Sequence, residues 1–205
     1  MFEALTGMGL ATSAGLNAYI PLLAMGLLDR YTGLVHLPAS SHWLSNGWVI
    51  GILSVLLAIE VVADKIPVVD HINDVLQTFV RPTSGGLAFG AATSAQTVTV
   101  SDPGSFFSSH HWIPIVAGAV ISLTVHGVKA TARPVINTTT AGFGAPVVST
   151  IEDVFSAVMS VVAIIMPVLI VVMVILMIWG FWVLLKRRAR RKDQRRLARE
   201  AGFNV

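Results

Sequence analysis

The sequence predicts an all-α, polytopic integral membrane protein, and three observations lead to this prediction. Apolar residues make up 54% of the 205 residues and charged residues only 12%, about half of what a soluble domain carries. The stretch 157–185 contains no charged side chain and exceeds the roughly 20 residues that a helix needs to cross a bilayer. A basic tail follows at once, because nine of the 14 lysines and arginines lie between Lys186 and Arg199.

The basic tail sets the expected topology. Lysine and arginine beside a membrane span remain on the cytoplasmic side, so we expect residues 1–185 to form the membrane domain and residues 186–205 a cytoplasmic tail. No aromatic side chain interrupts the run of basic residues up to Arg199. We therefore expect the tail to contact anionic lipids at the bilayer surface and not nucleic acid.

Hydropathy and turn residues divide the membrane domain into about five to seven membrane segments. The first is expected to be broken, because Asn17 and Pro21 interrupt a run that is rich in small residues. Small residues let helices approach closely, and they also favour a homo-oligomer. The expected segments are 4–28, 47–63, 66–80, 84–100, 112–131, 134–145 and 149–185, with loops at 29–46 and 101–111.

A repeated motif relates two halves of this domain, at about residues 4–80 and 84–185. Pro67–Thr78 recurs as Pro146–Ala157 with six of twelve positions identical. The stretch before each motif begins at a tryptophan and ends at a lysine. If each half crosses the membrane an odd number of times, the halves are inverted and a substrate site lies between them. As a helix, segment 66–80 would span about 21 Å of a ~30 Å hydrocarbon core, so we expect short, broken or re-entrant helices.

The repeated motif carries a polar stripe in both halves. With helical spacing, the first stripe consists of Asp70, Asn73, Asp74 and Gln77, and the same offsets in the second half give Ser149, Glu152, Asp153 and Ser156. Ionisable groups at membrane depth are costly and usually face a water-filled path or a partner charge. Asp74 and Asp153 are therefore candidates for binding a cation or relaying a proton. Alternatively, both stripes lie at the membrane interface with wetted carboxylates.

The two spans before these motifs carry opposite charges. Glu60 and Asp64 share one face of the first span. One face of the second span carries His126, Lys129 and Arg133. Either the two sets form buried structural ion pairs, or they form a site for an anionic group or for coupled protons. The spacing leaves both interpretations open.

Three further residues are candidates because of their positions. Asn17 and Tyr19 lie at the expected break in the first span. Arg81 immediately precedes Pro82, and the pair Arg133-Pro134 repeats this pattern. A proline at the first position of a helix, with an arginine beside it, would direct the helix N-terminus toward an anion.

Several kinds of chemistry are not expected. The chain has no cysteine, which excludes disulfides and thiolate sites. His110 and His111 are adjacent and would point apart on a helix or strand, so no metal site is expected, and nothing indicates a cofactor. No serine stands in a nucleophile-elbow pattern, and we do not expect an enzyme.

Four motifs resemble those of one known family. They are GLNAYIPLL at 15–23, ADKIPVVD at 63–70, RPTSGG at 81–86 and APVVSTIED at 145–153. On these motifs the chain resembles, over roughly residues 1–185, the bacterial membrane proteins grouped as domain of unknown function 4126. The resemblance implies a multi-pass protein of the bacterial inner membrane and brings no activity with it.

These observations give three expectations for function. The leading one is a small secondary transporter or channel that moves a small ion or solute along the repeated acidic residues. The second is a lipid translocase or scramblase, in which a polar stripe carries a phosphate headgroup. The third is a non-transporting membrane scaffold or assembly subunit.

Overall fold

The fold is described from a computed structural model for residues 1–93, 112–140, 144–180, 182–183 and 186. Within these ranges all regular structure is helical and no strand occurs, which confirms the all-α prediction. The chain divides into two compact units, Met1–Ile170 and Val171–Val205, and the contacts below lie within the first. The predicted loop 101–111 and nearly all of the basic tail lie outside the described residues.

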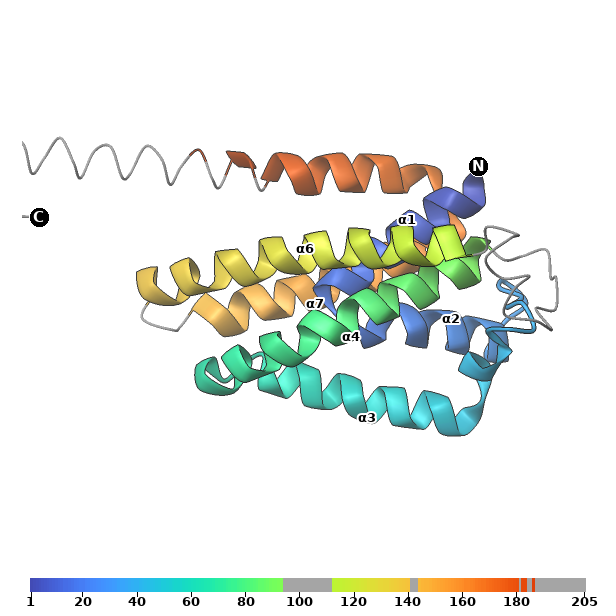
Figure 1. The fold of residues 1–205 in the computed structure, drawn as a ribbon, viewed down its shortest axis with the longest axis horizontal. Helices are drawn as coiled ribbons and strands as arrows, with labels where there is room; N and C mark the ends of the chain where they lie inside the picture. Colours follow the sequence, from blue (N-terminus) through green and yellow to red (C-terminus); the bar gives the residue numbers. More distant parts are fainter. Residues whose placement is uncertain (94–111, 141–143, 181, 184–185, 187–205) are drawn as a thin grey trace, which may run out of the picture. The chain divides into compact units, whose positions relative to one another are not determined.

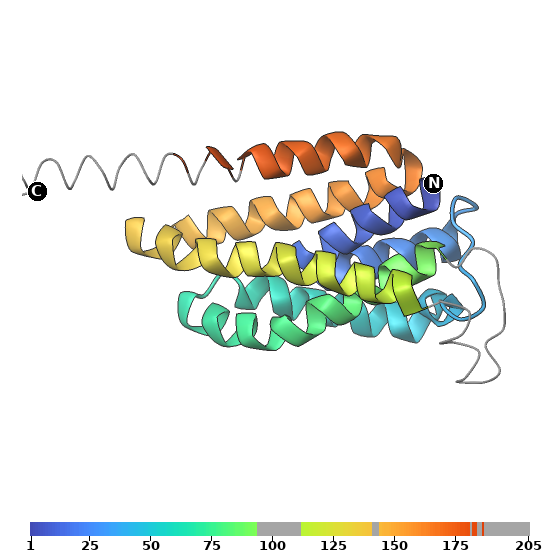
Figure 2. The same cartoon turned by 45° about the horizontal axis from the view of Figure 1, so that its top comes forward.

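The first unit is a bundle of helices (Figures 1 and 2). Its elements are α1 (Phe2–Leu16), α2 (Tyr19–Tyr31), a 3-10 helix (His42–Ser45), α3 (Gly47–Ala63), α4 (Pro67–Thr93), α6 (Trp112–Thr139) and α7 (Gly144–Ile165). Helix α1 packs against α4, α6 and α7, and α4 packs along α6. A further apolar helix covers Val168–Gly180.

The first predicted span is broken at the predicted residue. α1 ends at Leu16, Asn17 has an extended backbone with φ −143° and ψ 123°, and α2 begins at Tyr19. Asparagine suits such a junction because its side chain binds backbone groups that have no partner within a helix. Pro21 lies in the first turn of α2, where its missing amide costs no intrahelical hydrogen bond.

Two prolines that were predicted to begin helices lie inside them instead. α4 continues through Pro82 and α6 continues through Pro134, so the predicted divisions between segments at these prolines are wrong. An internal proline removes one intrahelical hydrogen bond and bends the helix. The packing of α1, α4 and α6 along one another outweighs that local cost and keeps both helices continuous.

The last predicted span is divided in two. α7 ends at Ile165 and the next apolar helix begins at Val168, so the uncharged stretch 157–185 does not form a single helix. The reason lies at Pro167, because the residue before a proline is sterically kept out of the helical region. Hydropathy alone does not reveal this break, since both sides of it are equally apolar.

Among the described residues, two helices are long and apolar enough to cross a membrane. They cover Trp112–Pro134 and Pro146–Ile165. Two shorter apolar helices cover Gly47–Ala63 and Val168–Gly180. By length and composition, the structure thus bears out the coarse expectation of apolar helices suited to a membrane.

The bundle buries charged and polar side chains among apolar ones, and it exposes many large apolar side chains. On α4, Val75 and Phe79 are 62% and 75% exposed, whereas Gln77 and Arg81 are buried. α7 repeats this arrangement with an outward stripe of Val147, Ile151, Val154, Val158, Val161 and Ile165 and inward-facing Ser156 and Ser160. Soluble proteins almost never bury a charged side chain completely unless it is paired.

Close helix crossings depend on glycine at two positions. A Cβ atom on Gly85 of α4 would lie 2.7 Å from the carbonyl oxygen of Gly118 on α6. A Cβ atom on Gly15 of α1 would lie 2.7 Å from the carbonyl oxygen of Ser122 on α6. Neither gap admits a side chain, so the missing Cβ atoms let α1, α4 and α6 approach one another closely.

Candidate functional site

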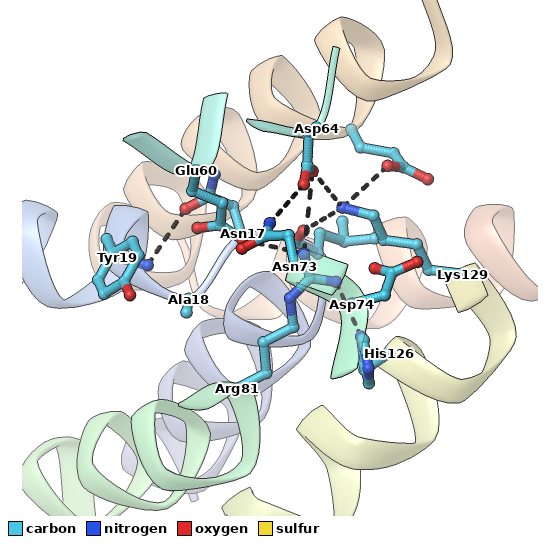
Figure 3. Close-up of polar contacts among 12 residues, drawn as sticks. Asn17, Ala18, Tyr19, Glu60, Asp64, Asn73, Asp74, Arg81, His126 and Lys129 are labelled. Carbon is cyan, nitrogen blue, oxygen red and sulfur yellow. Dashed lines mark hydrogen bonds and ion pairs between the residues drawn. The ribbon is translucent and has the colours of Figure 1, made fainter. Parts of the chain in front are cut away.

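Charged side chains from four helices gather in the interior of the bundle, and we call this group the ionic core (Figure 3). They come from α3 and the turn after it, from α4, from α6 and from α7. The unwound junction between α1 and α2 lies beside them. The ionic core consists of Glu60, Asp64, Lys65, Asp74, Arg81, Lys129, Arg133, Glu152 and Asp153.

Asp64 connects most of the cations of the ionic core. Its Oδ2 atom lies 2.8 Å from Arg133 Nη2, 3.1 Å from Lys129 Nζ and 4.0 Å from Arg81 Nη2. Its Oδ1 atom accepts a 2.8 Å hydrogen bond from the amide of Asn73. Asp64 is only 1% exposed, so protein partners take the place of water around this carboxylate, as a buried charge requires.

Arg81 is fully buried and joins α4 to three other helices. Its Nη2 atom donates to Glu60 Oε1 at 2.9 Å, and its Nη1 atom donates to the carbonyl oxygen of Gly15 at 3.2 Å. Nη1 also lies 3.0 Å from His126 Nδ1. A guanidinium only donates, so Nδ1 accepts, and Nε2 carries the hydrogen that faces Thr78 Oγ1 at 3.1 Å. These partners assign His126 as a neutral imidazole.

The broken helix contributes its backbone to the ionic core. The last carbonyl groups of α1 have no intrahelical partners and form the negative end of the helix dipole. One of them, on Leu16, accepts a 2.9 Å hydrogen bond from Lys129 Nζ. The side chain of Asn17 links the start of α2 to α7, because Oδ1 accepts from the amide of Tyr19 at 3.1 Å and Nδ2 donates to Asp153 Oδ1 at 2.9 Å.

Two acids of α7 complete the ionic core from the second half of the chain. Glu152 Oε2 lies 3.1 Å from Lys129 Nζ and 3.5 Å from Arg133 Nη2. Asp153 Oδ2 lies 3.9 Å from Lys65 Nζ. Their side chains are only 17% and 14% exposed. The acids and bases that the sequence singled out thus pair with one another inside the bundle.

Some buried polar atoms of this region have no hydrogen-bond partner within the part of the chain that the structure describes. They are Glu60 Oε2, Asp74 Oδ1, Gln77 Oε1, Arg81 Nε, Ser149 Oγ, Glu152 Oε2 and Asp153 Oδ2, of which the Asp74, Glu152 and Asp153 atoms still lie near a cation. Nearly all are oxygens. Orphaned buried polar atoms are uncommon in folded proteins and indicate strain, function or a bound water or ion.

The structure brings together those predicted site residues whose side chains it describes. Asp70 lies in the first turn of α4, but its side chain is outside the described ones. The half-buried ring of Tyr19 lies beside Gln77 and Glu60. The predicted site residues in the ionic core or bonded directly to it are Asn17, Glu60, Asp64, Asn73, Asp74, Arg81, His126, Lys129, Arg133, Glu152 and Asp153. Tyr19 joins them through Asn17, which accepts a hydrogen bond from the Tyr19 amide.

The predicted role of Arg81 at a helix N-terminus is wrong, and so is that of Arg133. Pro82 and Pro134 lie inside α4 and α6, so no helix begins there. Arg81 instead binds Glu60 and the C-terminal end of α1. That end carries partial negative charge, which suits a guanidinium.

Sequence reasoning missed most of the hydroxyl groups that support the ionic core, although it placed Ser156 on the second polar stripe. Ser122 Oγ donates to the carbonyl oxygen of Arg81 at 2.7 Å. It lies four and seven residues before His126 and Lys129, a spacing that could have identified it as part of the same face. A second group of hydroxyls lies between α1 and α7, where Ser13 Oγ is 2.7 Å from Ser156 Oγ and 2.6 Å from Ser160 Oγ.

The ionic core has no arrangement typical of a multivalent metal site. Among the described residues, no group of three or more His, Cys, Asp or Glu side chains is placed to hold a metal ion. A separate cavity of about 170 Å³ has a mostly apolar lining that includes no ionic-core residue. It is lined by Thr6, Leu10, Met25, Leu34, Val35, His36, Leu37, Ala91, Ala92 and Ile164.

Comparison with known proteins places the chain in a family. No curated protein and no solved structure matches it. Residues 4–187 match the family described as Domain of unknown function (DUF4126), which agrees with the resemblance of the four sequence motifs. Because the match covers most of the 205 residues, the chain belongs to the DUF4126 family.

Proposed function

We propose that the chain is a small multi-pass membrane transporter and that the ionic core is the site through which a small ion or solute passes. The observation that carries this proposal is the meeting of charged side chains from α3, α4, α6 and α7 at the unwound junction of α1 and α2. Burying so many charged side chains costs free energy, because each loses its hydration. A merely structural bundle would gain as much stability from apolar packing.

The distribution of polarity supports a bilayer as the surroundings of the bundle. Phe79 is 75% exposed, two residues before the fully buried Arg81 on the same helix. In water, apolar stripes on several helices would promote aggregation. In lipid, the same stripes face acyl chains, and the charged residues turn toward the protein interior. The four apolar helices described above supply candidate crossings, and the proposal therefore includes a multi-pass topology.

The break at Asn17 supports transport over a static scaffold. Transporters commonly bind their substrates where a membrane helix is interrupted, because the interruption leaves backbone carbonyls and amides free to interact. Here the carbonyl oxygens of Gly15 and Leu16 bind Arg81 and Lys129. The junction is thus in direct contact with the charges that a permeating species would meet.

The repeated motif supports two related halves with a site between them. Asp74 and Asp153 occupy the same position of the motif, and each lies near a basic residue of the other half, Arg133 and Lys65 respectively. If the halves are inverted, the Asp74–Arg133 pair and the Asp153–Lys65 pair face opposite sides of the membrane. Opening one pair while the other stays closed would then give alternating access. The inverted relation is part of the proposal.

The proposal also includes a location. The chain lies in the bacterial inner membrane with its basic tail on the cytoplasmic side, where the tail contacts anionic lipids. Small residues on outward faces mediate a homo-oligomer. The chain performs no catalysis and holds no cofactor in this proposal.

Cysteine accessibility tests whether the ionic core is open to water, because the chain has no native cysteine. Ser149 and Ser122 are both buried. Ser149→Cys and Ser122→Cys therefore place a thiol in the buried region, and the side chain changes little in size. Ser54→Cys is the matched control, because Ser54 is exposed on the apolar surface of α3. Each variant is treated in intact membranes with a small charged thiol reagent. A second sample is treated with a thiol reagent after the protein has been unfolded in denaturant.

The proposal predicts that Ser149→Cys and Ser122→Cys react in the folded protein although they are buried, while Ser54→Cys, facing lipid, reacts only after unfolding. The opposite pattern, with Ser54→Cys reactive and the core thiols inert, contradicts both the bilayer and the pathway. If all three thiols react only after unfolding, the ionic core is dry, and the scaffold interpretation replaces transport.

A further inference from the structure

We propose that the species bound in the ionic core is a small monovalent cation, the proton included, held by Glu60 together with Gln77 and Tyr19. This inference rests on the proposed function and deepens it by naming the class of substrate or coupling ion. It is carried by the charge balance of the core, by the kind of polar atom that lacks a partner, and by the position of those atoms beside the broken helix.

Counted over the side chains that the structure describes, the ionic core lacks one positive charge. Its described acids are Glu60, Asp64, Asp74, Glu152 and Asp153, and its described bases are Lys65, Arg81, Lys129 and Arg133. Five acids against four bases leave one negative charge, because His126 accepts from Arg81 and is neutral. The C-terminal end of α1 adds further partial negative charge. An uncompensated charge in a low-dielectric interior is costly, and one monovalent cation removes it.

The cations of the core already have partners. Lys129 Nζ donates to Leu16 O and Asp64, and it pairs with Glu152. The terminal nitrogens of Arg81 are bound to Glu60, Gly15 and His126. Of the described atoms of Lys129 and Arg81, only Arg81 Nε is buried without a partner, and this atom carries one N–H donor. One N–H does not hold a phosphate or carboxylate, which needs several donors, so an anionic headgroup fits the core poorly.

Two of the deeply buried orphaned atoms are acceptors that lie near Arg81. Glu60 and Gln77 are 1% and 3% exposed, and Glu60 Oε2 and Gln77 Oε1 have no partner in the described part of the chain. Both side chains lie beside Arg81, since Glu60 binds it and Gln77 precedes it by one helical turn. Oxygen atoms of this kind bind protons and hard cations.

Tyr19 adds a third oxygen beside the unwound junction. Its ring lies next to Glu60 and Gln77, and it is only half-buried at the start of α2, directly after the unwound junction. The ionisable groups acting on Glu60 are Arg81, Lys129 and Asp64. A set with one carboxylate suits a single positive charge, in agreement with the finding that the described residues include no cluster for a multivalent metal.

The test measures cation-dependent stability of the purified chain in detergent, where no transport takes place. The midpoint of thermal unfolding is recorded in chloride salts of sodium, potassium, ammonium and choline at constant ionic strength, and from pH 5 to pH 8. A ligand that binds only the folded state raises this midpoint in a saturable way. Wild type is compared with Glu60→Gln, Gln77→Leu and the control Glu3→Gln, which alters an exposed acid in the first turn of α1.

The inference predicts that one of the small cations, or protons, stabilises wild type and Glu3→Gln relative to choline. Glu60→Gln neutralises the excess charge, so its unfolding midpoint becomes independent of that cation and loses the part of its pH dependence that Glu60 causes. Gln77→Leu keeps the carboxylate and weakens the apparent affinity by about tenfold. Because Gln77→Leu and Glu60→Gln are judged on their response to cations and not on their absolute stability, a modest loss of stability does not obscure the result.

Three outcomes overturn the inference. The midpoint is the same in all salts and at every pH, or Glu60→Gln responds to the cation as wild type does, or phosphate alone stabilises the protein. A response to pH that Glu60→Gln abolishes, with no response to salt, identifies the proton. A response to one salt at fixed pH identifies that cation. If no cation stabilises the protein but the core thiols react in membranes, the cation inference is wrong and the transport proposal is retained. If a cation binds but the core thiols do not react in the folded protein, the cation site is retained and the transport proposal is wrong.

Discussion

Asp74 and Asp153 occupy equivalent positions in the repeated motif, and each lies about one ion-pair distance from a basic residue of the other half. Asp74 Oδ1 is 4.0 Å from Arg133 Nη1, and Asp153 Oδ2 is 3.9 Å from Lys65 Nζ. Both side chains are 14% exposed. At these distances the two charges of each pair attract one another but do not form a short hydrogen bond. These two pairs are therefore the contacts of the ionic core that break and re-form most easily.

The Asp64 carboxylate should be the most important single group for the stability of the bundle. Asp64→Asn removes the charge that holds Lys129 and Arg133 and leaves buried cations without compensation. We expect a loss of about 3–5 kcal/mol in the free energy of unfolding, measured by denaturant unfolding in detergent. Glu3→Gln, an exposed acid, is the control and should change stability little. An Asp64→Asn variant as stable as wild type would show that the ion pairs are not closed in the folded protein.

The planar shape of Arg81 should matter as much as its charge. Arg81→Lys keeps the charge, but one ammonium group does not reach Glu60, Gly15 and His126 together as the guanidinium does. We expect a loss of about 1–3 kcal/mol in the free energy of unfolding. Lys65→Arg is the matched control, because the side chain of Lys65 is 35% exposed and has room for the larger group. Equal effects of both substitutions would contradict the described network of Arg81.

The crossing of α4 and α6 predicts a clear difference between two glycines. Gly85→Ala places a Cβ atom 2.7 Å from the carbonyl oxygen of Gly118, so the helices must separate, at a cost of about 1–3 kcal/mol. Gly51→Ala on α3 meets nothing within 4 Å and should be neutral or stabilising by up to about 1 kcal/mol. The comparison of thermal midpoints in detergent checks this prediction. A Gly85→Ala variant that unfolds at the wild-type midpoint would show that the crossing is looser than described.

The connection after α2 should respond to acid through Asp29, which lies beyond the predicted span 4–28. Desolvation acts to raise the pKa of the Asp29 carboxyl, but hydrogen bonds from the Leu37 amide and from Ser45, with His42 nearby, outweigh it and hold the pKa below its usual range. A carboxyl whose pKa is lower in the folded state stabilises that state above its unfolded pKa of about 3.9. This contribution is lost as the pH falls through the folded value.

Asp29→Asn should therefore speed hydrogen exchange at the Leu37 amide at neutral pH, because the neutral side chain is a weaker acceptor than the carboxylate. The difference from wild type should shrink as the pH falls below about 4. Mass-spectrometric hydrogen exchange of the peptide that contains Leu37 measures it, with Glu3→Gln as the control. Identical exchange in Asp29→Asn and wild type at neutral pH would mean that the carboxylate does not hold this loop.

Much of the ionic core was predictable from the sequence because physical chemistry limits where charges can go in an apolar chain. Glu60 and Asp64 on one span, and Lys129 and Arg133 on another, have few ways to avoid lipid other than facing one another. Asn17 within a run of small residues signalled the break. The duplicated motif identified Asp74 and Asp153 as equivalent before any contact was known.

The remaining features depend on tertiary packing, which local sequence does not reveal. Pro82 and Pro134 look like helix starts, yet neighbouring helices keep α4 and α6 continuous. Pro167 does interrupt a helix, although its local sequence is no less apolar. The partner of Gly85 is Gly118 on a distant part of the chain, and only the fold shows which small residues meet.

The most direct measurement of the central claim, that ions pass through the ionic core, is cation flux in proteoliposomes. Vesicles containing wild type, Asp74→Asn or Asp153→Asn at equal protein content are given gradients of protons, sodium, potassium or ammonium, and uptake is followed against protein-free vesicles. The account predicts flux of one of these cations with wild type, and a reduction of about tenfold or more in each variant, since each loses one of the two exchangeable carboxylates. Wild-type flux equal to that of protein-free vesicles for all four cations, or equal flux in wild type and both variants, would contradict it.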